Sequence, residues 1–267
     1  MAHLLNIWPS VRASLLNTDR ILLLFDYDGT LTPIVARPED ALLPEETRQR
    51  LASLALQPRC IAGIVSGRSI ADLSVLADVP GLIHAGNHGM EIRGPGMNFI
   101  HPGAVAARDT LDRVRNTLAD ALAHVPGVIV EHKGLTLTVH FRATPQPLAA
   151  EVGDVVTATA GPYVESGQLR LTRGKMVVEV RPAIQWDKGK AIKKIHRHSR
   201  EGGNLEDSLL PVYFGDDRTD EDGFRMVQKM GGIAVFVGDS RQGTVALHQL
   251  DSPGEVSETM RLLLEEL

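Results

Sequence analysis

The chain has 267 residues, of which 43% are hydrophobic and 23% charged, and its formal net charge is −5. These values are ordinary for a globular protein, and the basic residues form no stripe of the kind that binds nucleic acid. No segment has the roughly 20 consecutive apolar residues of a membrane span, and the N-terminal segment lacks the pattern of a signal peptide. The single cysteine, Cys60, excludes an internal disulfide. We therefore expect a cytoplasmic protein that binds neither nucleic acid nor membranes; its oligomeric state is not predicted, and a monomer fits.

Short apolar runs predict the strands of a parallel sheet. The first, residues 21–25, is apolar at five successive positions, which is typical of a strand buried on both faces. Three similar runs follow at 61–65, 211–214 and 233–237. Segments with helical spacing at 44–56 and 221–230 suit the crossover connections. The fold class is therefore α/β, with a doubly wound, Rossmann-like core.

The middle of the chain does not show this pattern of apolar strands and crossover helices. Strand-like runs lie close together at 128–130, 135–141, 169–171 and 176–180, and helical patterns at about 104–123 and 148–160 separate them. This pattern predicts an inserted α+β domain whose sheet is mixed or antiparallel. We expect the core to comprise residues 1–101 and 183–267 and the inserted domain residues 102–182, with hinges at glycine- and proline-containing segments.

The stretch KKIHRHSREGG, residues 193–203, is the part of the chain nearest to a low-complexity tract. It is typical of a solvated helix end followed by a loop, because it runs into two glycines. Since it matches no motif that we can assign, an inserted loop before the strand at 211–214 is the alternative.

Two carboxylates follow the first apolar run. Asp26 and Asp28 are two residues apart, so both lie on one side of an extended chain, and Gly29 permits a tight turn after them. Close carboxylates repel each other unless a cation lies between them or one of them is protonated. Mg²⁺ suits such oxygen ligands. On its own, Asp-Gly-Thr fits an ordinary turn equally well.

Other polar motifs follow later segments. Ser66-Gly67-Arg68 can bind a phosphate oxygen through the serine hydroxyl and a backbone N–H, or Ser66 can cap a helix. Lys188 precedes a helical segment. It is a candidate for the site, and an ordinary surface lysine is the alternative. The segment 215–220 carries three acids and fits either a metal site or a solvated acidic turn.

The order of these four motifs resembles that of the haloacid dehalogenase superfamily of phosphohydrolases. The resemblance implies that Asp26 attacks phosphorus to form an aspartyl-phosphate and that Asp28 acts as general acid and base. Lys188 and Ser66 would complete the catalytic set. Magnesium would be held by Asp26, the main-chain carbonyl of Asp28, and Asp216.

The same resemblance implies supporting roles for three more residues. Thr30 would fix the Asp28 side chain by a hydrogen bond. Asp217 and Asp220 would orient Lys188 or metal-bound waters, and the sequence does not apportion these two roles.

Further motifs narrow the resemblance. They are HAGNHGME at 84–91, EHK at 131–133, HFR at 140–142, GKMVVEVRP at 174–182 and GDDRTDED at 215–222. Together they resemble the trehalose-6-phosphate phosphatase family, which implies an inserted cap domain of the C2 type that recognises the substrate. The implied reaction is hydrolysis of trehalose 6-phosphate, a small-molecule sugar phosphate, to trehalose and phosphate, the last step of trehalose biosynthesis.

Polar pairs in the inserted domain are candidates for sugar binding. Residues two apart in a strand share a face. Three such pairs present polar groups together: Glu131 with Lys133, His140 with Arg142, and Glu179 with Arg181. Cross-strand ion pairs on a solvated sheet face are the alternative. The residues expected to contact substrate are Asp28, Ser66, Gly67, Arg68, His88, Glu131, Lys133, Lys175 and Glu179.

Two other functions remain open. Relatives that share this core and cap hydrolyse other glycosyl phosphates, such as sucrose phosphate or a glycosyl-phosphoglycerate. A catalytically silent module that binds sugar phosphates is the other alternative, and the intact set of Asp26, Asp28, Lys188 and Asp216 argues against it.

Overall fold

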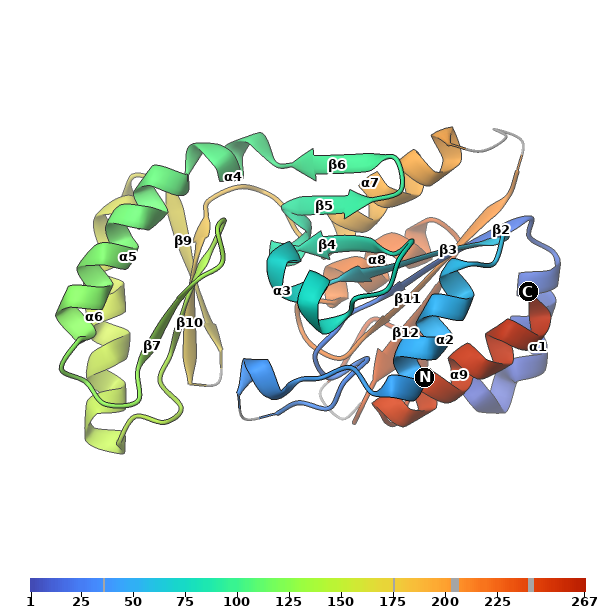
Figure 1. Ribbon diagram of the computed structural model, residues 1–267, viewed down its shortest axis with the longest axis horizontal. Helices are drawn as coiled ribbons and strands as arrows, with labels where there is room; N and C mark the ends of the chain where they lie inside the picture. The colour runs from blue at the N-terminus through green and yellow to red at the C-terminus, as the bar shows by residue number, and fades with distance from the viewer. Residues whose placement is uncertain (36, 175, 203–206, 240–242) are drawn as a thin grey trace. The chain divides into compact units, whose positions relative to one another are not determined.

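The computed structural model describes the chain except for residues 36, 175, 203–206 and 240–242 (Figure 1). The chain divides into two compact units. Unit 1 comprises Met1–Phe99 and Trp186–Leu267, and unit 2 comprises Ile100–Gln185. The expected limits of the inserted domain, 102 and 182, differ from those of unit 2 by two and three residues. That unit 2 recognises the substrate stays a prediction.

Unit 1 is built on one large sheet whose strands pair in the order β1-β13-β12-β11-β2-β3-β4-β5-β6. The strand pairs from β1 to β4 are parallel, and β5 runs antiparallel to β4. The strands are β1 (Ala2–His3), β2 (Arg20–Phe25), β3 (Cys60–Val65), β4 (Ile83–Gly86), β5 (Glu91–Gly94), β6 (Met97–Ile100), β11 (Leu209–Gly215), β12 (Ile233–Val237) and β13 (His248–Leu250). The parallel α/β core is confirmed, and the sheet continues beyond the four predicted strands on both sides.

Helices cover both faces of this sheet (Figure 1). They are α1 (Trp8–Leu16), α2 (Glu45–Ala55), α3 (Ile70–Leu76), α7 (Lys188–Glu201), α8 (Glu221–Lys229) and α9 (Pro253–Glu266), with short 3₁₀ helices η1 (Leu4–Ile7), η2 (Pro38–Asp40) and η3 (Asn87–Gly89). The crossover helices expected at 44–56 and 221–230 correspond to α2 and α8.

The apolar run in β2 explains why the sheet is covered on both sides. Successive side chains of a strand point to opposite faces. Leu23 and Phe25 pack in a cluster with α1, α2 and α9, whereas Leu22 and Leu24 pack in a second cluster with α7 and α8. All four side chains are completely buried. Burial of each contributes roughly 1.5–3 kcal/mol, so β2 anchors both halves of the core.

The helix end predicted within the stretch 193–203 is confirmed for residues 193–201, whereas the alternative of an inserted loop that begins at residue 193 is wrong there. Those residues form the second half of α7, whose buried positions Ala191, Ile192 and Ile195 recur with helical spacing. The side chain of Asp187 caps the start of this helix by accepting a hydrogen bond from the backbone N–H of Lys190 at 2.8 Å. Residue 203 lies outside the described part of the chain.

Unit 2 contains an antiparallel sheet with strand order β7-β8-β10-β9. Its elements are α4 (Pro102–Ala106), α5 (Arg108–Leu122), β7 (Ile129–His132), β8 (Leu137–His140), α6 (Gln146–Glu165), β9 (Leu169–Gly174) and β10 (Val177–Pro182). Helices α5 and α6 pack on one face, where Leu137, Val139, Val178 and Val180 are buried. The predicted α+β character is confirmed.

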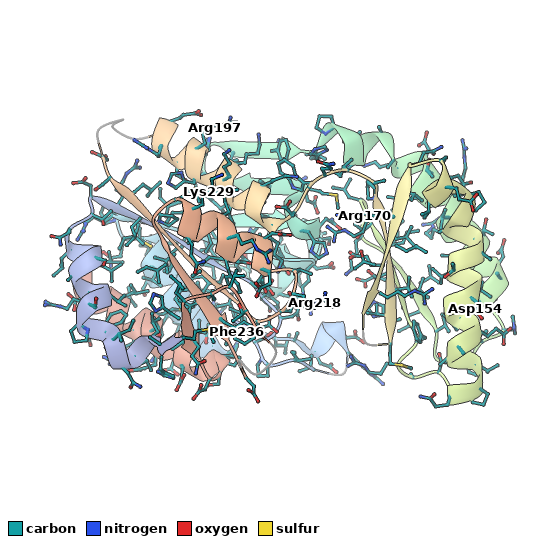
Figure 2. The ribbon with its side chains drawn as sticks, turned by 180° about the vertical axis from the view of Figure 1, so that it is seen from behind. Asp154, Arg170, Arg197, Arg218, Lys229 and Phe236 are labelled. Carbon is teal, nitrogen blue, oxygen red and sulfur yellow. The ribbon has the colours of Figure 1, made fainter. Side chains whose placement is uncertain are left out.

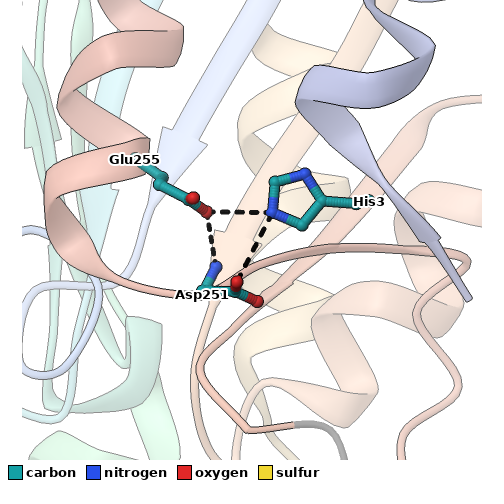
Figure 3. A group of neighbouring side chains, drawn as sticks. All are labelled: His3, Asp251 and Glu255. Atoms are coloured by element: carbon teal, nitrogen blue, oxygen red, sulfur yellow. Dashed lines mark hydrogen bonds and ion pairs between the residues drawn. The ribbon is translucent and has the colours of Figure 1, made fainter.

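A polar contact joins the first strand to the last helix (Figure 3). The His3 Nε2 atom lies 3.1 Å from Glu255 Oε2 and 3.8 Å from Asp251 Oδ2. Glu255 Oε2 also accepts a hydrogen bond from the backbone N–H of Asp251 at 2.6 Å. These three side chains offer a histidine nitrogen and carboxylate oxygens close together, and their contacts with one another hold β1 against α9.

Within the described residues, each helix is too short or too polar to cross a bilayer.

We expect Leu23→Ala to lower the free energy of unfolding by about 3 kcal/mol, because Leu23 is completely buried and the substitution leaves a cavity. Urea denaturation measures the change. Leu56→Ala is the matched control, since Leu56 is 81% exposed, and its effect should stay within about 0.5 kcal/mol. Equal losses in the two variants would contradict the assigned core.

Candidate active site

The candidate site lies at the carboxyl ends of three adjacent strands. Asp26 follows β2, Ser66 follows β3, and Asp216 follows β11. Strand β2 lies between β11 and β3, and the chain order of the strands reverses between β2 and β11. Ligand sites in open parallel sheets form at such a reversal, outside the carboxyl ends of the strands.

Lys188 supplies a buried positive charge at this site. It is the first residue of α7 and is 2% exposed. Its Nζ lies 2.7 Å from Asp220 Oδ1 and 3.0 Å from Asp26 Oδ1. Burial acts to lower the pKa of Lys188, but the carboxylates of Asp220 and Asp26 outweigh it and raise the pKa above its usual value. The side chain is therefore an ammonium that bridges two carboxylates.

Asp220 organises the acidic turn after β11. Its Oδ1 accepts hydrogen bonds from Lys188 Nζ and the Tyr213 hydroxyl. Its Oδ2 accepts from the backbone N–H groups of Asp216 at 3.0 Å and Asp217 at 3.1 Å. Asp220 thus orients Lys188, one of the two roles left open for it. Tyr213 was missed, and its only signal was a hydroxyl in an otherwise apolar strand.

Carboxylate oxygens of Asp26, Asp216 and Asp220 all lie within 4.8 Å of one another. Burial raises the pKa of Asp26 well above its usual value, although Lys188 opposes this effect. Burial, followed by the charges of Asp220 and Asp217, raises the pKa of Asp216 to about 7. With all three carboxylates ionised, Lys188 would balance only one of their charges, so a cation at this point would favour the ionised forms. Their hard oxygen donors fit Mg²⁺. Because Asp220 already accepts four hydrogen bonds, Asp26 and Asp216 are the better ligands.

Gly29 allows Asp216 to reach this cluster. Its φ is +81°, and a Cβ atom placed there would lie 2.1 Å from Asp216 Oδ2. The neighbouring Thr30 donates a hydrogen bond from Oγ1 to Asp216 Oδ1 at 3.4 Å. Thr30 was expected to hold Asp28, so the structure gives it a different partner. Asp217 makes a local turn, in which its Oδ1 accepts from the N–H and hydroxyl of Thr219, each at 2.7 Å.

Asp28 is held by Arg68. The guanidinium donates from Nε to Oδ2 and from Nη2 to Oδ1, both at 2.7 Å, and it lies over the Tyr27 ring. This two-point contact fixes the carboxylate plane of Asp28. We had expected Arg68 to contact substrate; in the structure it positions Asp28, and a substrate contact stays a prediction.

Ser66 and His88 form a compact loop beside β3. Ser66 is 2% exposed, and its Oγ accepts a hydrogen bond from the backbone N–H of Arg68 at 3.2 Å. The helix cap considered for Ser66 belongs to Ser69, which caps α3 reciprocally with Asp72. The His88 ring packs against Gly67, where a Cβ atom would lie 2.9 Å from His88 Cε1.

An asparagine stabilises the turn that carries His88. Asn87 and His88 have φ angles of 49° and 57°, in the left-handed region where asparagine is favoured among residues with side chains. Asn87 Nδ2 donates to Glu91 Oε1 at 2.8 Å, and the same oxygen accepts from the backbone N–H of Ile70 at 2.9 Å. Glu91 therefore links this turn to the start of α3; the spacing of Asn87 and Glu91 in the sequence was its only signal.

The predicted sugar-binding residues of unit 2 lie together on one sheet face. Glu131 Oε2 is 2.7 Å from His140 Nε2 and 3.7 Å from Lys133 Nζ. Glu179 Oε2 is 3.8 Å from Arg181 Nη1. Figure 2 shows Arg170 of β9, which pairs with Arg181, on the side of the sheet opposite to Asp154 of α6. Lys175 lies outside the described residues.

The comparisons first define the class of fold, which is that of the haloacid dehalogenase-like hydrolases. The fold is similar to that of a haloacid dehalogenase-like hydrolase from Bacteroides thetaiotaomicron, with a TM-score of 0.63 and 15% identity over 91% of this chain and 99% of that one. The family model described as trehalose-phosphatase matches residues 24–253. The chain belongs to the trehalose-phosphatase family.

Two relatives place the chain within that family. It is 38% identical to the trehalose-phosphate phosphatase of Mycobacterium avium, over 91% of this chain and 62% of the relative. The solved C-terminal domain of trehalose-6-phosphate phosphatase from C. albicans is 27% identical with a TM-score of 0.77, and the match covers 95% of this chain and 96% of that domain. The chain thus spans about three-fifths of the length of the mycobacterial relative.

We expect Asp220→Asn to destabilise the protein by about 3–5 kcal/mol, because the buried Lys188 ammonium loses a charged partner. Asp222→Asn, in the first turn of α8, is the matched control, since Asp222 is exposed and pairs only at the surface with Arg225. Urea denaturation compares the two variants, and a similar small loss in both would contradict the role given to Asp220.

Proposed function

We propose that the protein is a magnesium-dependent phosphatase that hydrolyses trehalose 6-phosphate to trehalose and phosphate. The observation that carries the proposal is Lys188 Nζ at 3.0 Å from Asp26, at the carboxyl end of the central strand, in a chain of the trehalose-phosphatase family. The names of the relatives support trehalose 6-phosphate as substrate.

Asp26 and Asp28 perform the two chemical roles in this proposal. An Asp26 oxygen attacks phosphorus, the bond from phosphorus to the sugar oxygen breaks, and Asp28 donates a proton to that oxygen. Asp28 then takes a proton from a water molecule. The water oxygen attacks the phosphorus of the aspartyl-phosphate, which releases phosphate and restores Asp26. Arg68 orients the ionised Asp28 carboxylate through two hydrogen bonds, one of which weakens while Asp28 holds the proton.

The attack requires an ionised Asp26 close to an anionic phosphate. Lys188 favours that ionised form and offers its ammonium to the phosphate oxygens, and Ser66 with the Gly67 N–H adds neutral donors. Asp26, the Asp28 carbonyl and Asp216 hold Mg²⁺, which when bound supplies the positive charge that the cluster lacks. In unit 2, Glu131, Lys133, Lys175 and Glu179 bind the sugar, and His88 contacts the substrate from unit 1.

The substrate assignment is tested by phosphate release from trehalose 6-phosphate, sucrose 6-phosphate, glucosyl-3-phosphoglycerate and glucose 6-phosphate. We expect trehalose 6-phosphate to exceed the others by at least about tenfold in kcat/KM, because buried polar groups reject substrates that leave them unpaired. A chelator should abolish release. Asp26→Asn, which removes the nucleophile, should also abolish it. Equal rates on all four esters would defeat the trehalose assignment, and release by Asp26→Asn at the wild-type rate would defeat the mechanism.

We expect Gly29→Ala to lower kcat/KM by about 10²-fold and to weaken Mg²⁺ binding, because the new Cβ displaces the Asp216 carboxylate. Gly231→Ala is the matched control. Gly231 also has a positive φ, +75°, but a Cβ there meets no atom within 4 Å among the described residues. The control should lose about 1–2 kcal/mol of stability and keep its activity and its Mg²⁺ affinity by calorimetry. Equal losses of activity in Gly29→Ala and Gly231→Ala would show that backbone strain alone lowers the activity.

A further inference from the structure

The hydroxyl of Thr138 is an unusual feature of the unit 2 sheet. Thr138 lies in the middle of β8 and is 4% exposed. Among the described residues, its Oγ1 atom has no hydrogen-bond partner. Buried polar groups are generally hydrogen-bonded, and one without a partner in the protein calls for a specific explanation.

The strand register places Thr138 between two carboxylates. It pairs with Glu131 of β7 on one side and with Glu179 of β10 on the other. Directly paired residues share a sheet face, and neighbouring strands are about 4.8 Å apart, so the two glutamate backbones are separated by about 10 Å. The neighbours of Thr138 in β8, Leu137 and Val139, point the other way into the core with α5 and α6.

Glu131, Thr138 and Glu179 form a row across three strands, and the charges around this row indicate what it binds. Glu131 contacts His140 and Lys133, and Glu179 contacts Arg181, so each carboxylate already has a basic neighbour. A phosphate placed directly between the two carboxylates would be repelled by both. A neutral ring with several hydroxyls can donate to the carboxylates and can both donate to and accept from Thr138.

We propose that Thr138 Oγ1, which its neighbours cover in the structure, becomes accessible when those side chains move and hydrogen-bonds a hydroxyl of the substrate's unphosphorylated glucose ring, which lies between Glu131 and Glu179. This inference rests on the proposed function and deepens it. Thr138 then helps to determine specificity, because it favours a disaccharide phosphate over a monosaccharide phosphate.

The test is Thr138→Val, which keeps the shape of the side chain and removes the hydroxyl. We expect KM for trehalose 6-phosphate to rise about three- to tenfold with kcat nearly unchanged, as for the loss of one neutral hydrogen bond. For glucose 6-phosphate, which lacks the second ring, kcat/KM should not change. Thr138→Ser keeps a hydroxyl and should restore most of the affinity.

Stability separates this role from a structural one. Because the hydroxyl has no partner within the described protein, Thr138→Val should leave Tm unchanged or raise it. Thr144→Val is the matched control. Thr144 is also buried with an unpartnered hydroxyl, but it lies in the loop between β8 and α6, so its KM should match that of the wild type.

Binding of free trehalose, followed by NMR, tests the inference without turnover. Weaker trehalose binding to Thr138→Val than to the wild type supports the inference. This holds even if the wild type releases no phosphate from trehalose 6-phosphate, because that result would defeat only the proposed function. An unchanged KM for trehalose 6-phosphate, or unchanged trehalose binding, overturns the inference. A fall in Tm together with equal losses on both phosphate esters also overturns it.

Discussion

The structure depends on one buried ammonium among carboxylates. Lys188 lies between Asp26 and Asp220, and all three side chains are almost completely buried. Removal of charge from water is unfavourable unless partners and hydrogen bonds compensate, and here the compensation comes from three separate elements: the end of β2, the start of α7 and the turn after β11. Because Asp220 also binds the N–H groups of that turn, the charge that orients Lys188 also fixes the backbone that presents Asp216.

The two units differ in how their charged side chains are arranged. Unit 1 brings several carboxylates together, and such a cluster can bind an anionic group only when cations are also present. Unit 2 instead spreads carboxylates and basic groups in pairs across a sheet face, as Glu131 with His140 and Glu179 with Arg181 show. Such balanced pairs suit neutral hydroxyls. One chain thereby separates the groups proposed to act on the phosphate from those proposed to distinguish the sugar.

Local patterns predicted much of this arrangement. The strands β2, β3, β11 and β12 can be predicted from their apolar runs, because a strand buried on both faces does not alternate apolar and polar residues. The ends of these strands then indicate Asp26 and Asp216. Two contacts could not be predicted because they depend on how loops pack after the sheet has formed. Arg68 binds Asp28 from another loop, and Tyr213 binds Asp220 only because the turn after β11 folds back over the strand. In α7, the helical spacing of Ala191, Ile192 and Ile195 was recognisable in the sequence, but the position at which the helix ends among the basic residues was not.

The position of unit 2 in the chain affects the order of folding. Every strand pair of unit 2 joins segments within residues 129–182, whereas Thr30 and Asp216, which meet at the site, are 186 residues apart. Local contacts form faster than distant ones because less chain entropy is lost, and N-terminal segments leave the ribosome first. During synthesis, unit 2 can therefore fold while β2 still lacks its neighbour β11. Asp26 meets Lys188 late, so a nascent chain can hold a folded unit 2 before the charged cluster of unit 1 has formed.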